Sequence, residues 1–240
     1  MSLAYSRENP SPEYLRLAAL YKDHHNSSDN ENWAKDVYPG KSLWPHIGFI
    51  KAAIERHGAK TLLDYGAGKG MQYTNMRVKV AKGKMYPSVS VYWGIKETCY
   101  DAGYQPFNKW PEGKFDGVIS TDVLEHCSQD DIEWIISEMF EKAEKFVFAN
   151  IACYPAKTIL PNGENAHATI QPPEWWQDVI EKVSKKYPNV AYYFIATTKK
   201  NEQSTLISNQ EAFDDVPAVG ALPGNIFKAY AQLIQQRLGL

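Results

Sequence analysis

The glycine-rich turn that follows a short apolar strand constrains the fold of this chain more than any other feature. Residues 61–64 (Thr-Leu-Leu-Asp) have the pattern of a buried strand, and the chain then runs through Gly66, Gly68 and Gly70. Glycines allow a tight turn and let the backbone approach a ligand without a Cβ in the way. In a doubly wound α/β sheet, ligands bind beyond the carboxyl ends of the strands. The segment therefore predicts an α/β fold with a ligand site beside the first strand.

Helical and strand patterns alternate along the rest of the chain. Apolar residues at helical spacing predict helices at about 12–22, 43–57, 130–143 and 173–183, and a last amphipathic helix at 225–238. Short apolar runs predict strands at 95–101, 115–120 and 145–150, and a hairpin of 190–197 with 204–208. Residues 71–95 show no clear pattern. This order predicts a mainly parallel sheet covered on both faces, with an antiparallel strand at its end.

Composition narrows the classes of partner. The chain has 240 residues and a formal net charge of −2, which disfavours nucleic acid as a general partner because phosphate binding needs a basic surplus. No apolar run approaches the roughly 20 residues that span a bilayer. The 3 cysteines contain no CxxC pair, so we expect reduced thiols and a cytoplasmic location. The sequence carries no indication of oligomeric state.

The spacing of the glycines discriminates between ligands. A dinucleotide-binding fingerprint, GxGxxG or GxGxxA, requires a small residue at position 71, where this chain has Met71. That disfavours a nucleotide-binding oxidoreductase. The pattern here is DxGxGxG, which suits a cofactor without phosphates, such as S-adenosylmethionine.

Two segments together resemble a known superfamily. LLDYGAGKG (62–70) resembles motif I of the class I S-adenosylmethionine-dependent methyltransferases, and FDGVISTDVLEHC (115–127) resembles their fourth-strand segment. The resemblance implies a Rossmann-like, seven-stranded sheet whose final strand is antiparallel. It also implies a methyltransferase domain at 61–210, an N-terminal helical cap at 1–60 and a C-terminal helical appendage at 211–240.

The resemblance implies a set of cofactor-binding residues. The family places residues of the glycine turn beside the methionine and ribose parts of the cofactor, and an acid at the end of the second strand on the ribose hydroxyls. Asp101 ends the second predicted strand, but only 15 positions separate it from Asp116 (116 − 101). Either the third-strand region is trimmed or Glu97 is the ribose acid. The expected cofactor-binding residues are Asp64, Gly66, Gly68, Gly70, Asp101, Thr121 and Asp122.

An acid–histidine cluster follows the fourth-strand segment. Asp122, Glu125 and His126 have the i, i+3, i+4 spacing that brings side chains together on one helical face, and His167 in the loop 151–172 is a candidate fourth ligand. The arrangement resembles metal-dependent O-methyltransferases, including plant-type small-RNA 2′-O-methyltransferases, which hold a divalent ion such as Mg²⁺ or Mn²⁺. Two alternatives remain open: a structural Glu-His pair, and a metal-free general base at His126 or His167.

These observations predict methyl transfer from S-adenosylmethionine to an oxygen or nitrogen of a small molecule. The alternatives are a 2′-O-methyltransferase of RNA ends and a non-catalytic relative that only binds the cofactor. Residues 160–176 are expected to form a substrate-facing lid with Trp175 toward the cleft and Trp176 packed inward, unless both tryptophans simply anchor the next helix.

Overall fold

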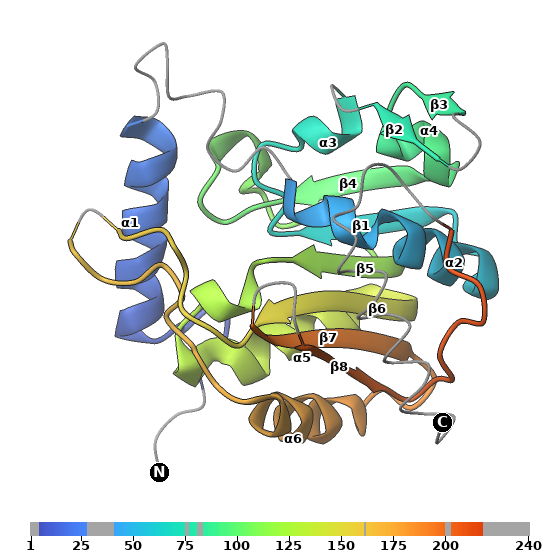
Figure 1. The fold of residues 1–240 in the computed structure, drawn as a ribbon. Coiled ribbons are helices and arrows are strands. Elements are labelled where there is room, and N and C mark those ends of the chain that lie inside the picture. The colour runs from blue at the N-terminus through green and yellow to red at the C-terminus, as the bar shows by residue number, and fades with distance from the viewer. Residues whose placement is uncertain are drawn as a thin grey trace.

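The fold is built around one twisted sheet with helices on both faces (Figure 1). The computed structural model describes residues 5–27, 41–74, 77–80, 84–160, 162–199 and 203–217, apart from the side chains of 23–27, 41 and 74. The strands of the main sheet, in spatial order, are β4 (Lys96–Tyr100), β1 (Thr61–Tyr65), β5 (Phe115–Thr121), β6 (Ala143–Ala152), β7 (Ala191–Lys199) and β8 (Gln203–Ser208). All neighbouring pairs are parallel except β7 with β8. The predicted α/β class and the antiparallel last strand are confirmed.

The expected count of seven strands is wrong for the described residues, where the main sheet has six strands. Between β4 and β5 the chain forms only a 3-10 turn, Gln105–Phe107, because the interval is too short for a further helix and strand. The stretch without a clear pattern folds into α3 (Met71–Thr74), a small hairpin of β2 (Val78–Lys79) with β3 (Met85–Tyr86), and α4 (Val89–Trp93). In the described sheet no strand lies beyond β4, so β4 is the edge strand and β1 is second from the edge.

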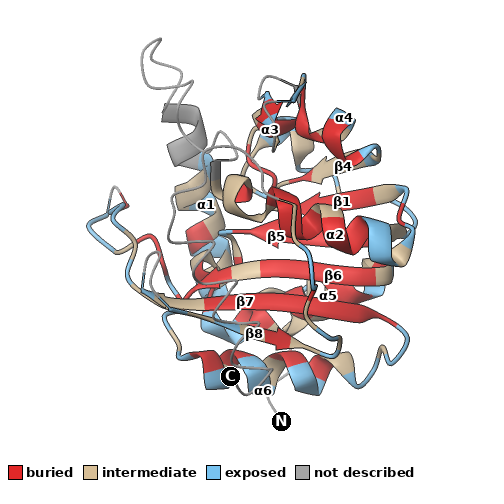
Figure 2. Ribbon diagram, turned by 45° about the vertical axis from the view of Figure 1, so that its right-hand side comes forward, coloured by how far each residue is buried: buried red, intermediate tan, exposed pale blue. Residues whose placement is uncertain are grey.

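The strands of the main sheet are largely buried (Figure 2), and the alternation of their side chains divides the core into two layers. Along β6, Phe146 and Phe148 pack with α2 (Ile47–His57), while Val147 and Ala149 pack on the opposite face with α5 (Ile132–Lys142) and α6 (Pro173–Ser184). Strands buried on both faces read as near-continuous apolar runs, which is the pattern seen at 146–149.

The remaining long helix, α1 (Pro12–Ser27), stands beside the edge at which the parallel strands end, next to the loop 151–172 (Figure 1). The predicted helix at 225–238 lies outside the described residues. Within the described ranges, no helix has both the length and the apolarity needed to cross a bilayer.

Candidate functional site

The glycine turn forms where the sequence places it, directly after β1. Gly66, Gly68 and Gly70 have φ values of 83°, 57° and 63°, in the left-handed region that favours glycine. The backbone N–H groups of residues 66 and 67 donate to the carbonyl oxygen of Tyr100, at 2.8 and 3.0 Å. The turn is therefore fastened to the carboxyl end of β4.

Gly66 is required by packing as well as by its φ. A Cβ at this position would lie 2.3 Å from Cγ2 of Val123, in the segment that follows β5. A larger side chain at position 66 would therefore clash first with Val123. It would not point first into the space that the resemblance assigns to the cofactor.

We expect Gly66→Ala to lower Tm by about 2–12 °C, since a positive φ at a residue with a Cβ costs about 1–3 kcal/mol. Gly113→Ala is the matched control, because Gly113 also has a positive φ (74°) but has nothing within 4 Å of an added Cβ. The extra loss of Tm in Gly66→Ala compared with Gly113→Ala measures the clash with Val123. Adding Val123→Ala to Gly66→Ala is expected to recover part of that loss. Equal losses of Tm in both glycine variants would show that Val123 does not restrict this position.

Asp64 is buried under the glycine turn with one oxygen unsatisfied. Its Oδ2 accepts hydrogen bonds from Gln72 Nε2 (3.1 Å) and Tyr73 OH (2.8 Å), both on α3, whereas Oδ1 has no partner among the described residues. Burial raises the pKa of Asp64 to about 7, and the two hydrogen bonds lower it only in part. A buried acceptor without a donor is costly, so this oxygen is suited to a ligand that brings one.

Asp101 lies at the carboxyl end of β4, as expected of the ribose acid, but its carboxylate is already engaged. Oδ2 accepts from the backbone N–H of Gly68 at 2.8 Å, and Oδ1 accepts from Gly103 and Tyr104 at 2.9 and 3.0 Å. The alternative, Glu97, lies within the strand, opposite Leu62. Of the two acids, only Asp101 follows its strand and contacts the glycine turn.

The chain bends sharply where β5 ends. Thr121 is buried, and its Oγ1 lies 3.3 Å from Ser42 Oγ. Asp122 follows with a φ of 61°, and it is the one non-glycine residue with positive φ in the described ranges. A 3-10 turn, Leu124–His126, comes next. Unusual backbone conformations of this kind cluster at functional sites.

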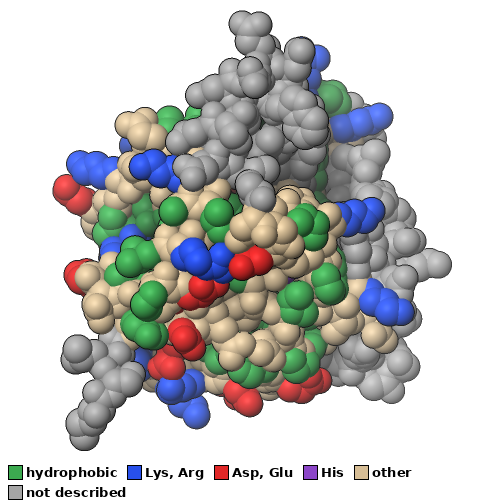
Figure 3. Space-filling view, turned by 90° about the vertical axis from the view of Figure 1, so that its left-hand side faces the viewer, with side chains coloured by type: hydrophobic (Ala, Val, Ile, Leu, Met, Phe, Trp, Pro, Cys, Tyr) green, Lys and Arg blue, Asp and Glu red, His purple; other side chains and the backbone are tan. Residues whose placement is uncertain are grey.

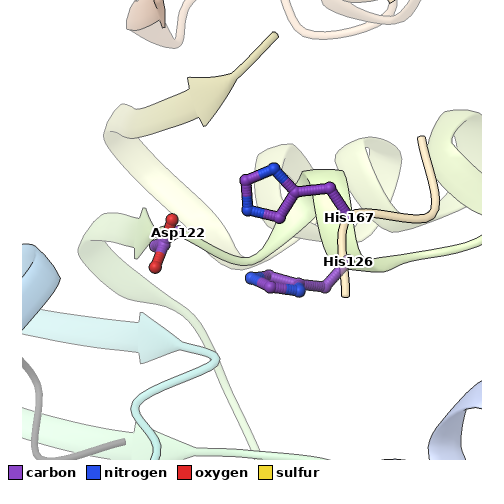
Figure 4. A group of neighbouring side chains, drawn as sticks. All are labelled: Asp122, His126 and His167. Carbon is purple, nitrogen blue, oxygen red and sulfur yellow. The ribbon is translucent and has the colours of Figure 1, made fainter. Parts of the chain in front are cut away.

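Asp122, His126 and His167 converge at this bend. One ligand atom from each residue lies within 4.8 Å of the others, and Figure 4 shows both imidazoles extending toward Asp122. Nδ1 of His126 lies 2.7 Å from the carbonyl oxygen of Ala166, and Nδ1 of His167 lies 2.5 Å from that of Tyr154. A carbonyl oxygen only accepts, so each Nδ1 carries the proton and each Nε2 keeps its lone pair, the arrangement usual for metal-binding histidines.

The electrostatic surroundings favour a neutral imidazole at His126. Burial lowers the pKa of His126, and the neighbouring His167 lowers it further, while the charge of Asp122 raises it. A neutral imidazole is the form that binds a metal ion or accepts a proton. The three side chains can therefore offer two nitrogen ligands and one carboxylate.

Glu125, expected as a fourth ligand, does not join this group. It is fully buried, and its Oε1 accepts from the backbone N–H of Ala152 at 2.7 Å. Burial raises the pKa of Glu125 well above its usual range, and the charge of Asp122 raises it further. The expected convergence assumed α-helical spacing, whereas here a left-handed residue is followed by a 3-10 turn, and Glu125 bonds the backbone at the end of β6.

Around this group, the structure differs from expectation at Trp175 and adds a contact from Tyr21 that the sequence does not indicate. Trp176 is fully buried as expected, but Trp175 packs against the same core cluster, which supports the alternative that both tryptophans anchor α6. Tyr21 on α1 lies 2.7 Å from Nδ1 of His126, although 105 positions separate the two residues. No motif in the sequence marks Tyr21 as part of this site.

Neither a family model nor a curated protein matches this sequence. Among solved structures, the chain is similar to the Burkholderia thailandensis 1,6-didemethyltoxoflavin-N1-methyltransferase, crystallised with 1,6-didemethyltoxoflavin and S-adenosylhomocysteine. The identity is 13% and the TM-score 0.48, over 79% of this chain and 84% of that one. At that level of similarity, the activity and ligands of that enzyme do not transfer to this chain.

Proposed function

We propose that this protein is an S-adenosylmethionine-dependent methyltransferase whose acceptor is an oxygen, or a nitrogen, of a small molecule. The observation that carries the proposal is the left-handed glycine turn at the end of β1, fastened to β4 above a buried acid with an unpaired oxygen. Such a turn at the carboxyl ends of parallel strands is where α/β sheets bind their ligands.

The residues around the turn fit this cofactor. The unpaired Oδ1 of Asp64 would accept from the cationic ammonium of the methionine part, and binding there would offset the cost of burying the carboxylate. Asp101 would hold the turn and face the ribose from the end of β4. When bound, the cofactor supplies a methyl group activated by its sulfonium, so the protein mainly has to orient the acceptor and exclude water.

The acid–histidine group fits a divalent cation. Asp122, His126 and His167 would be its ligands, with Glu125 held apart on the backbone of β6. Two imidazoles favour a first-row transition metal over Mg²⁺, which prefers oxygen ligands. Of the two ions that the sequence suggests, Mg²⁺ and Mn²⁺, this favours Mn²⁺. A metal bound here would lower the pKa of an acceptor hydroxyl, which favours oxygen over nitrogen as the acceptor atom.

The surface favours a small acceptor over a nucleic acid. On the face that Figure 3 shows, basic and acidic side chains are interspersed, and the described residues there form no basic stripe. Together with the net charge of −2, this distribution gives little electrostatic attraction for a phosphate backbone.

The direct test is an assay of S-adenosylhomocysteine release with a panel of small alcohols, phenols, carboxylates and amines. We expect turnover with at least one hydroxyl acceptor, greater with Mn²⁺ than with Mg²⁺ and suppressed by a chelator. Turnover that is indifferent to chelation would remove the metal from the proposal and leave His126 or His167 as a general base. No turnover with any acceptor, despite tight cofactor binding, would favour a non-catalytic relative.

A further inference from the structure

The N-terminal helix reaches the candidate metal site from outside the sheet. Leu17 on α1 packs with Leu160 and Ala166 of the loop 151–172 in a small apolar cluster. The preceding residue, Arg16, forms an ion pair with Glu164 at 2.7 Å. These contacts hold one face of α1 against the loop that carries His167.

Tyr21 extends from the same helix to His126. Its hydroxyl donates to the carbonyl oxygen of Ala166 at 2.7 Å, and its oxygen lies 2.7 Å from Nδ1 of His126. The two rings meet edge to face, with centroids 5.5 Å apart and planes at 85°. Both oxygens near Nδ1 are therefore placed to accept its proton, because the hydroxyl proton already points to the carbonyl.

We infer that Tyr21 is a positioning residue, which holds the His126 ring with its Nε2 lone pair toward Asp122 and His167. The inference rests on the proposed metal site. Groups that bond the outer nitrogen of a ligating histidine fix its orientation and commonly contribute 10–100-fold to metal affinity. Since the carbonyl of Ala166 remains when the hydroxyl is removed, the lower end of that range applies to Tyr21.

The start of α1 is anchored firmly enough for such a role. The Arg7 guanidinium bonds both carboxylate oxygens of Glu138 on α5, at 2.6 and 2.5 Å, and lies 3.6 Å from the ring centroid of Trp110. Ser11 immediately precedes the helix, and both its backbone N–H and its hydroxyl donate hydrogen bonds to the buried carboxylate of Asp131. The bond from the backbone N–H is 3.0 Å long, and the bond from the hydroxyl is shorter. Position 21 is thus presented by a helix fixed at its beginning and along its face.

The test compares Tyr21→Phe with Tyr14→Phe by titration of the ligand-free protein with Mn²⁺ alone. Tyr14 is on the same helix, but its ring packs edge to face on Trp134, so its variant controls for loss of a hydroxyl from α1. We expect Tyr21→Phe to bind Mn²⁺ about tenfold more weakly than the wild type. Tyr14→Phe is expected to stay within twofold.

A second readout needs no metal. In nitrogen-15 NMR spectra, His126 of the wild type is expected to carry its proton on Nδ1, and that proton should exchange faster with water in Tyr21→Phe. Wild-type and Tyr21→Phe proteins with equal Mn²⁺ affinity and equal exchange would overturn the inference and leave the metal site intact. A wild type that binds no Mn²⁺, Zn²⁺ or Mg²⁺ would instead refute the metal site itself, and the role of Tyr21 with it.

Discussion

Replacing His167 with alanine is expected to lower the Mn²⁺ affinity of the protein at least 100-fold. His126→Ala is expected to lower it by a slightly smaller factor. Each variant leaves two ligands of the three, and loss of a direct ligand exceeds the 10–100-fold typical of residues in the surrounding shell. Metal titration of the purified variants measures the effect, with Tm recorded to verify that each variant is folded.

Glu125→Gln is the matched control for this experiment. A glutamine keeps an oxygen that can accept from the backbone N–H of Ala152 and replaces the other carboxyl oxygen with an NH2 group. Because Glu125 Oε1 is bonded to the backbone of Ala152 and Glu125 is not one of the three converging residues, we expect its Mn²⁺ affinity to stay within a few-fold of the wild type. A loss in Glu125→Gln as large as that in His167→Ala would establish a four-ligand site and show that the side chain turns toward the ion when the ion binds.

Asp64→Asn is expected to make the ligand-free protein more stable at pH 8 and less able to bind the cofactor. The folded-state pKa of Asp64 is raised from 3.8 to about 7 by burial. Its stabilising contribution is therefore complete below pH 3.8 and is lost as pH rises through about 7, where the buried carboxylate ionises. The shift corresponds to an upper bound of about 4 kcal/mol, from which the poorer hydrogen bonding of an amide subtracts.

Thermal unfolding at two pH values measures this effect. We expect Asp64→Asn to have a Tm several degrees above the wild type at pH 8 and a smaller advantage at pH 5, where only part of the contribution of Asp64 is lost. Calorimetry at pH 8 should show at least tenfold weaker binding of S-adenosylhomocysteine, because the amide cannot pair with an ammonium. A variant that is less stable at pH 8 yet binds the cofactor normally would mean that Asp64 serves only to hold α3.

The parts of the fold that sequence predicted well have strong local patterns. The strand at 61–65 is apolar and ends in an acid and glycines, and α5 repeats apolar residues at helical spacing from Ile132 to Phe140. In the region 71–95 the elements have only 2–5 residues each, too short for any periodicity to appear. The count of seven strands that the resemblance implies fails because the interval from Asp101 to Asp116 has no room for a further helix and strand, the trimmed alternative that the sequence leaves open.

In the candidate site, the sequence predicts which residues gather but not how they are arranged. Asp122, His126 and His167 were recognised from spacing and from loop position, and the structure brings them together. Glu125 was misplaced because a positive φ at Asp122 cannot be read from a motif that assumes a helix. Tyr21 was missed because its contact with His126 depends on how α1 docks, which is a property of tertiary packing.

The proposed function depends on binding of S-adenosylmethionine at the glycine turn. Titration calorimetry of the wild-type protein with S-adenosylhomocysteine, without metal and then with Mn²⁺, tests it most directly. We expect a single site with a dissociation constant in the micromolar range or below, present in both conditions. No detectable binding in either condition would contradict it, because the turn at Gly66–Gly70 and the unpaired oxygen of Asp64 would then need another ligand.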